Sequence, residues 1–265
     1  MNIVYAALSL GILGLVFGIL LGFASKAFEV KVDPKIPKLR ECLPGANCGG
    51  CGFAGCDAYA EAVVMEGAKP NLCSVGGSAT AEKIGEVLGV KVEAGEKKAA
   101  FVKCNGNCDS AKERYDLEGV NDCLTASLMI DGGSKACSYG CLGLGSCVSV
   151  CEFGALEVVN GVAKVNVDKC TNCGACINIC PKGLIESVNL NSKVRVECNN
   201  VEIGKHVKEN CSNACIGCRL CERNCPSDAV HVNNNLAKVD YDKCVNCGVC
   251  TTKCPTKAIK NIFLN

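Results

Sequence analysis

Cysteines are the side chains whose spacing along this chain points to a definite chemistry. The stretch CVNCGVCTTKCP at 244–255 places four thiols and a proline within twelve residues, and CTNCGACINICP at 170–181 repeats the arrangement. Thiolates ligate iron, and the spacing C-x2-C-x2-C-x3-C followed by proline is typical of [4Fe–4S] cluster sites. The two stretches therefore predict iron–sulfur sites.

The cysteine content of the whole chain allows two other kinds of protein. There are 26 cysteines in 265 residues, a density that also occurs in disulfide scaffolds and zinc proteins. Disulfide scaffolds are usually much shorter, and neighbouring thiols on one tight loop cannot all pair without strain. Structural zinc takes two distant C-x2-C pairs or includes histidine, whereas the chain has only His206 and His231. Iron–sulfur chemistry is therefore favoured over both alternatives.

The cysteine pattern is duplicated over a long part of the chain. An offset of 74 residues aligns 137–185 with 211–259, and in each copy two cysteine runs flank a short hairpin-like segment. In two-cluster ferredoxins the fourth cysteine of each run ligates the other cluster. The later copy is regular and predicts two ligand sets, which are Cys215, Cys218, Cys221 and Cys254, and Cys225, Cys244, Cys247 and Cys250.

The earlier copy departs from this pattern at one position. Leu144 stands where the later copy has Cys218, and Cys137 is the obvious substitute. A three-iron cluster or a shifted potential stays open for this irregular set. The two predicted sets are Cys137, Cys141, Cys147 and Cys180, and Cys151, Cys170, Cys173 and Cys176.

A separate cysteine group precedes both copies. Cys48, Cys51, Cys56 and Cys73 have the spacing C-x2-C-x4-C-x16-C, among glycines that let the backbone wrap closely around a bulky ligand. The segment DAYAEAVVMEGA predicts a helix that returns the chain so that Cys73 closes the site. These cysteines suit one [4Fe–4S] cluster, whereas Cys42 lies outside the spacing and is expected to be a free thiol.

Five further cysteines are candidates for a sixth cluster. Cys104, Cys108 and Cys123 lie close together in the sequence, and Cys198 follows a predicted strand that would deliver it as the fourth ligand. Cys211 is the alternative fourth ligand. These thiols could also be unligated and buried. The sequence therefore predicts five clusters and leaves the sixth open.

The N-terminal segment 3–25 is apolar and carries no charge. Its 23 residues are enough for one helical span of a bilayer about 30 Å thick. A cleaved signal peptide is the alternative, but it needs a basic segment before a shorter apolar stretch. Basic residues follow the segment instead, which predicts that the C-terminal side is cytoplasmic. The thiolates require a reducing compartment, which independently agrees with that orientation.

These observations predict an α+β chain of five parts. We expect a single N-terminal transmembrane helix, a small [4Fe–4S] domain, a cysteine-containing insert and two bacterial-type two-cluster ferredoxin units with short strands and helices. The predicted bounds are 1–28, 29–92, 93–136, 137–198 and 199–265.

The sequence gives no sign of bond-making chemistry. It has no Walker loop, no G-x-G-x-x-G after a strand and no histidine-based acid–base set. We therefore expect no catalytic residue, flavin or NAD on this chain, and interpret the cysteine sites as a path for electrons. A basic stripe for nucleic acid is also lacking.

The chain resembles the RnfB family, the B subunits of Rnf complexes. The stretch LPGANCGGCGFAGCDAYA, the glycines after Cys73, the N-terminal span and the ferredoxin units carry the resemblance, which covers essentially the whole chain. It implies an ion-translocating ferredoxin:NAD⁺ oxidoreductase in the membrane, with soluble ferredoxin as donor. Flavin and NAD would belong to a partner subunit, and the coupled ion would be Na⁺ or H⁺.

Two other functions remain alternatives to this resemblance. One is a relay subunit of a different membrane oxidoreductase, such as a hydrogenase or a reductase, and the other is a metal-storage protein. If ferredoxin is the donor, Lys253, Lys257 and Lys260 near Cys254 are candidates for its docking surface, because ferredoxins are usually acidic. An ordinary solvated run of lysines is the simpler interpretation of these three residues.

Overall fold

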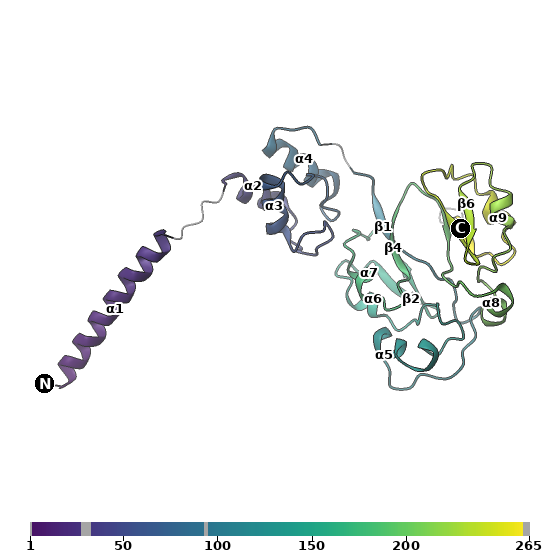
Figure 1. Cartoon of the computed structure of the whole chain (residues 1–265), viewed down its shortest axis with the longest axis horizontal. Helices are drawn as coiled ribbons and strands as arrows, with labels where there is room; N and C mark the ends of the chain where they lie inside the picture. The colour runs from purple at the N-terminus through teal and green to yellow at the C-terminus, as the bar shows by residue number, and fades with distance from the viewer. Residues whose placement is uncertain (1, 28–32, 93–94, 262–265) are drawn as a thin grey trace.

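The computed structural model describes residues 2–27, 33–92 and 95–261 of the chain. In Figure 1 the chain passes from one long helix, α1, through a group of shorter helices, α2 to α4, into a larger part that holds the strands. Every sheet among the described residues is a single antiparallel strand pair. This mixture of helices and short strands agrees with the predicted α+β class.

Helix α1, Asn2–Ala27, is 26 residues long. It runs without interruption because it contains no proline, the residue that breaks helix interiors. Its described apolar side chains, such as Leu10 and Phe23, are exposed. Among the residues that the structure describes, no helix meets the length and apolarity needed to cross a membrane. The predicted transmembrane helix is therefore not confirmed.

The N-terminal domain contains three helices, α2 (Lys35–Cys42), α3 (Cys56–Met65) and α4 (Gly77–Leu88). Apolar residues recur at intervals of three or four in these helices, so each buries one face. Leu39, Tyr59 and Ile84 meet in their common core and are each 1% exposed. The Tyr59 hydroxyl donates a hydrogen bond to the Lys69 carbonyl at 2.8 Å. This bond fastens the segment that carries Cys73 back toward the start of α3.

The first ferredoxin-like unit combines two strand pairs with four short helices. Its strands are β1 (Lys98–Val102), β2 (Leu156–Val159), β3 (Val162–Val165) and β4 (Ile185–Asn189), and its helices are α5 (Cys123–Ser127), η1 (Ile130–Gly132), α6 (Ser146–Ser149) and α7 (Ala175–Ile179). Strands β2 and β3 form a hairpin. Asn160 and Gly161 at its turn have φ of 48° and 73°, the left-handed conformation that Asn-Gly turns adopt. The predicted hairpin is confirmed.

The second unit repeats this arrangement. Its strands are β5 (Val194–Val196), β6 (Val230–Asn233), β7 (Leu236–Val239) and β8 (Ile259–Asn261), and its helices are α8 (Gly204–Asn210), α9 (Leu220–Arg223) and α10 (Val249–Lys253). Strands β6 and β7 form the hairpin, with Asn234 and Asn235 at φ of 49° and 62°. The sequence duplication therefore corresponds to a structural duplication.

Strand pairing crosses two of the predicted domain boundaries. Strand β1 belongs to the predicted insert, 93–136, but pairs with β4 of the first unit. Strand β5 belongs to the predicted first unit, 137–198, but pairs with β8 of the second. Each unit thus gains a strand from the segment that precedes it, because its last strand otherwise has no partner. The boundaries after residues 28 and 92 adjoin 28–32 and 93–94, which lie outside the described residues.

The two units meet around Arg195 of β5, whose side chain is fully buried. Its guanidinium carbon lies 4.7 Å from the centroid of the Tyr241 ring and 5.8 Å from that of Phe101. Its Nη2 donates a hydrogen bond to the Asn189 carbonyl at 2.6 Å. Because Phe101 lies on β1 and Tyr241 in the second unit, this side chain ties the two units together.

Thiols form a large share of the buried core in both units. Cys147 and Cys176 are buried with Leu156 and Leu184 in the first core. The second core holds five buried cysteines, which are Cys198, Cys211, Cys215, Cys221 and Cys250. Side chains that could ligate a cluster thus take positions that other proteins of this size fill with larger apolar residues.

Candidate iron–sulfur sites

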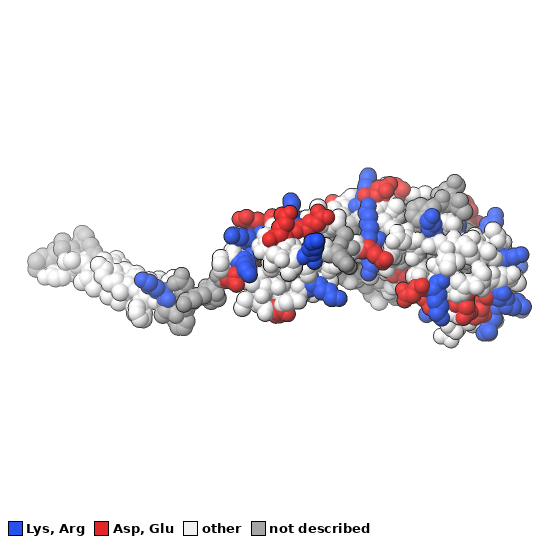
Figure 2. Space-filling model, turned by 90° about the horizontal axis from the view of Figure 1, so that it is seen from above, with Lys and Arg blue, Asp and Glu red and all other residues white. Residues whose placement is uncertain are grey.

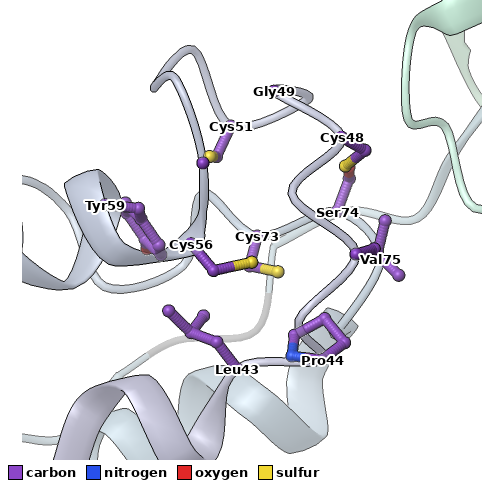
Figure 3. A pocket seen from close by; sticks show the side chains of 12 residues that line it. Leu43, Pro44, Cys48, Gly49, Cys51, Cys56, Tyr59, Cys73, Ser74 and Val75 are labelled. Atoms are coloured by element: carbon purple, nitrogen blue, oxygen red, sulfur yellow. The ribbon is translucent and has the colours of Figure 1, made fainter. Parts of the chain in front are cut away.

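The N-terminal domain holds a group of four thiols, here called site I. Figure 3 shows the four side chains around one space, which Leu43 and Pro44 close on one side. The cavity has a volume of about 330 Å³. The four thiols are those of Cys48, Cys51, Cys56 and Cys73. They are the set that the sequence spacing groups together.

Local hydrogen bonds shape the loop of site I. The backbone N–H of Cys56 donates to the Asn47 side-chain oxygen at 2.8 Å, which fixes the start of α3. The backbone N–H of Gly76 donates to Cys73 Sγ at 3.4 Å. Burial raises the pKa of the Cys73 thiol, and the charge of the three neighbouring thiols raises it further. A cation or cluster that binds these groups would relieve this mutual repulsion.

Site II lies in the first ferredoxin unit. Its cavity of about 370 Å³ is lined by Cys123, Cys141, Cys147 and Cys180. Burial raises the pKa of Cys147 to about 12, and the other three thiols add to this rise through their charge. The backbone N–H of Cys123 donates to the Ser146 hydroxyl at 2.8 Å, which joins the start of α5 to α6.

Site II differs from the predicted set by one residue. The sequence places Cys137 beside Cys141, Cys147 and Cys180, but the structure places Cys123 there. The local spacing favours Cys137 because it lies four residues before Cys141. The turn after η1 instead directs Cys137 to another cavity, described below, and the insert supplies Cys123.

Site III is the second thiol group of the first unit. Its members are Cys151, Cys170, Cys173 and Cys176, which line a cavity of about 320 Å³ and match the predicted set. Burial raises the pKa of Cys176 to about 11, with further contributions from the other three thiols. Two backbone N–H groups donate to sulfur at 3.3 Å, Ala100 to Cys170 and Ala155 to Cys151.

Two further groups occur in the second unit, in the predicted combinations. Site IV comprises Cys215, Cys218, Cys221 and Cys254, and site V comprises Cys225, Cys244, Cys247 and Cys250. Burial raises the pKa of Cys221 to about 12 and that of Cys250 to about 11, and in each case the other three thiols of the group raise it further. The backbone N–H groups of Ala237 and Ala229 donate to Cys215 and Cys225 at 3.5 and 3.3 Å.

A sixth group, site VI, lies where the insert and the two units meet. Its cavity of about 350 Å³ is lined by Cys104, Cys137, Cys198 and Cys211. Both Cys104 Sγ and Cys211 Sγ adjoin Gly106, at 3.6 and 3.5 Å from where a Cβ would stand. The Asn200 side-chain N–H donates to Cys137 Sγ at 3.4 Å.

Site VI contains two of the four cysteines predicted for the sixth cluster. Cys104 and Cys198 are there, together with Cys211, the predicted alternative ligand, and Cys137. Cys108 is exposed and lies apart from this cavity, and Cys123 belongs to site II. Cys42 is also outside the six groups, and its thiol donates to the Lys38 carbonyl at 3.3 Å within α2.

A repeat in the sequence could have identified the members of site VI. Cys137 and Cys211 are equivalent under the 74-residue offset. Cys104 and Cys198 each come two residues after the strand that completes a unit, β1 or β5, and each precedes an asparagine. The site is therefore built from two equivalent pairs, one member of each pair associated with each unit.

The six groups fit [4Fe–4S] clusters in ligand number and surroundings. Each offers four thiols, the number such a cluster requires. Each also has at least one described backbone N–H that donates to a ligand sulfur at 3.3 to 3.5 Å, as Leu184 does to Cys180 in site II and Cys141 to Cys104 in site VI. Within the described ranges, no group of three or more His, Cys, Asp and Glu side chains is placed to hold a single metal ion.

Two protein families match the regions that contain these sites. The family described as "Putative Fe-S cluster" matches residues 43–75, which include site I. The family described as "4Fe-4S dicluster domain" matches residues 169–229 and 214–258. The matches support four-iron clusters without fixing their number.

Curated relatives align with nearly the whole chain, and all three are B subunits of redox complexes. The chain is 46% identical to that of the ion-translocating oxidoreductase complex of Methanosarcina acetivorans, over 94% of both chains. It is 45% identical to that of the Na(+)-translocating ferredoxin:NAD(+) oxidoreductase complex of Acetobacterium woodii, over 88% of this chain and 70% of the relative. It is 44% identical to that of the proton-translocating ferredoxin:NAD(+) oxidoreductase complex of Clostridium ljungdahlii, over 86% and 81%.

Proposed function

Because the chain belongs to the family of B subunits of ion-translocating ferredoxin:NAD⁺ oxidoreductase complexes, we propose that it is the iron–sulfur electron-transfer subunit of such a complex. It takes electrons from reduced ferredoxin and passes them toward the NAD- and flavin-carrying partner. The observation that carries this proposal is the convergence of 24 cysteines into six groups of four. The chain contributes cluster ligands and no catalytic residue.

The residues of each group hold and tune the group they bind. When bound, a [4Fe–4S] cluster supplies a centre that takes up and releases one electron without a change of ligands. The thiolates of Cys48, Cys51, Cys56 and Cys73 would hold it in site I, and the other five groups act in the same way. The backbone N–H donors stabilise negative charge on the sulfurs, and the apolar walls keep water away.

Contacts between neighbouring groups support one continuous series of sites. Site I adjoins site III, because the Ser74 hydroxyl donates to the Asn172 carbonyl at 3.2 Å. Sites II and III share the first unit and exchange a cysteine run, as sites IV and V do in the second. Electron transfer over short protein-filled gaps then needs no movement of the two units relative to each other.

We infer that site VI is a cluster site and that it joins the two units. The backbone N–H of Cys141, a member of site II, donates to Cys104 Sγ of site VI at 3.3 Å. On the other side, the backbone N–H of Cys215, a member of site IV, forms a hydrogen bond that lowers the pKa of Cys198, although burial is the larger effect and raises it to about 12. These two peptide contacts support a count of six clusters, with site VI between sites II and IV.

We further propose that α1 anchors the chain in the membrane, with the cysteine-rich parts on the cytoplasmic side. The uncharged run 3–25 and the exposed apolar side chains of α1 support this assignment. The remaining subunits of the complex would provide the ion path for Na⁺ or H⁺. Alkylation of an engineered cysteine in α1 with membrane-permeant and impermeant reagents tests the topology.

Ferredoxin docking is proposed at the second unit. Figure 2 shows several basic side chains, with acidic ones beside them, at the end of the molecule that this unit forms. Lys253 and Lys257 next to Cys254 are exposed, whereas Lys260 pairs with Glu197 at 3.3 Å. The first two lysines are therefore the better candidates for contact with an acidic protein.

Anaerobic titration of the purified, cluster-loaded chain with reduced ferredoxin tests the proposed function. Electron paramagnetic resonance (EPR) should show reduced [4Fe–4S] signals that grow as the ferredoxin is oxidised. A loaded chain that ferredoxin fails to reduce, while dithionite reduces it fully, would contradict the assignment of ferredoxin as donor.

A further inference from the structure

A buried lysine lies at site VI and takes no part in ligation. Lys135 is 4% exposed and lines the same cavity as Cys104, Cys137, Cys198 and Cys211. Its Nζ donates hydrogen bonds to the carbonyl oxygens of Gly106 and Gly161, at 2.9 and 2.7 Å. The side chain is therefore fixed from two sides and does not extend into solvent.

No carboxylate neutralises Lys135 among the described residues. The ion pairs of the described chain do not include it. A charged ammonium is rarely buried without a partner, because desolvation is costly. The negative charge closest at hand is that of the site VI thiolates, and the Lys135 charge lowers the pKa of both Cys104 and Cys211, although burial has the larger, opposite effect.

Site VI also receives more hydrogen bonds to sulfur than the other groups do within the described ranges. Cys104 Sγ accepts from the backbone N–H groups of Gly106 and Cys141, at 3.4 and 3.3 Å. Cys137 Sγ accepts from the Asn200 side chain at 3.4 Å. Donors and positive charge stabilise the reduced form of a cluster, which carries one more negative charge than the oxidised form. Burial strengthens this effect because the local dielectric is low.

We propose that Lys135 is the charge partner of a cluster in site VI and makes this site the first of the six to be reduced. This inference rests on the proposed function, since it requires that site VI holds a cluster. In the reduction, one electron leaves the donor, ferredoxin or dithionite, and enters site VI. No bond forms or breaks, and the Lys135 ammonium keeps its proton. Lys135 thus positions the electron at the junction of the two units without touching the donor.

The test compares Lys135→Met with Lys135→Arg in the full-length, cluster-loaded protein. Potentiometric titration followed by EPR gives the midpoint potential of each signal, and Cys198→Ser identifies the signal of site VI as the one it alters. We expect the site VI signal to appear first in the unaltered protein. Lys135→Met should lower the reduced-to-oxidised ratio of that signal at least tenfold at a fixed potential, a shift of about 59 mV for one electron. Lys135→Arg should retain most of the original potential.

Lys83→Met serves as the matched control, because Lys83 is exposed on α4 of the N-terminal domain. It should leave every midpoint potential unchanged. Full iron content with an unchanged site VI potential in Lys135→Met would overturn the inference and leave the proposed function intact. If Lys135→Met does not retain iron, the order of reduction in the unaltered protein decides: a site VI signal that appears last would also overturn the inference. Absence of any cluster from site VI of the unaltered protein would refute the six-site proposal itself.

Discussion

The hydroxyl of Ser74 donates a hydrogen bond to the backbone carbonyl of Asn172 at 3.2 Å. Ser74 follows the last cysteine of site I, and Asn172 precedes Cys173 of site III. The same approach brings Gly50 against Cys173, where a Cβ would stand 2.8 Å from the Cys173 carbonyl oxygen. The N-terminal domain therefore meets the first ferredoxin unit at a point where ligand loops of two cluster sites touch.

Substitution at Gly50 should disturb this contact. Gly50→Ala places a methyl group inside the contact distance of the Cys173 carbonyl, and such overpacking costs about 1 to 3 kcal/mol. We expect slower electron transfer between sites I and III, measured by rapid-freeze EPR after mixing with a reductant, with iron content unchanged.

Gly95→Ala is the control for Gly50→Ala. The nearest atom to a Cβ at Gly95 is the Asn71 carbonyl oxygen at 3.8 Å, an ordinary contact. Ser74→Ala, which removes one hydrogen bond, should have a smaller effect than Gly50→Ala. Equal rates in Gly50→Ala and Gly95→Ala would show that this contact does not limit transfer.

Single cysteine substitutions should sort the thiols of the first unit into sites II and VI. Cys123→Ser should alter the same EPR signal as Cys147→Ser, because both line one cavity. Cys137→Ser should instead alter the signal that Cys198→Ser alters. Cys108→Ser and Cys42→Ser are controls that should retain all iron. A signal shared by Cys137→Ser and Cys147→Ser would restore the grouping that local spacing favours.

These residues also show how far the sequence determines the sites. Site I and sites III to V follow from spacing, because their ligands lie on one loop or on two runs joined by a hairpin. Cys123 and Cys137 could not be assigned in this way. Cys123 reaches site II through a contact between α5 and Ser146, and Cys137 faces Asn200 from beyond the boundary of the second unit. Such contacts depend on how the units pack, which spacing along the chain does not encode.

The fold was predictable to a similar extent. The duplication and both hairpins follow from the repeat and from the turn residues, as at Asn160 and Gly161. The pairing of β1 with β4 and of β5 with β8 joins segments far apart in sequence. Their apolar residues indicate strands but do not select a partner, so the predicted boundaries divided each unit from its first strand.

Retention of the clusters should depend on pH. Burial raises the pKa of Cys147 and of Cys221 to about 12, so both thiols are protonated at neutral pH when no cluster is bound. Cluster binding requires thiolates and releases these protons. Its free energy therefore becomes less favourable as the pH falls, by about 1.4 kcal/mol per pH unit for each thiol.

The direction of this effect can be measured with an iron chelator. Clusters should be lost faster at pH 6 than at pH 8, when the protein concentration and ionic strength are the same. A rate that is independent of pH, or faster at pH 8, would show that the protonation of these thiols does not govern cluster loss.

Neutralisation of two lysines should weaken ferredoxin docking. Lys253→Gln with Lys257→Gln removes exposed positive charge beside Cys254, so oxidation of reduced ferredoxin should slow severalfold at low salt. The difference should shrink as salt is added, because screening removes the steering. The control is Lys83→Gln, on the N-terminal domain. An unchanged rate at low salt would place ferredoxin on another surface.

The number of clusters tests the central claim most directly. Iron and acid-labile sulfide should be measured per chain on anaerobically purified, full-length protein, with zinc measured in the same sample. Six groups of four thiols predict about 24 iron and about 24 sulfide, since each cluster contains four of each. A value near 20 in the unaltered protein, unchanged by Cys198→Ser, would show that site VI is not a cluster site. Little iron with stoichiometric zinc would contradict the electron-transfer function as a whole.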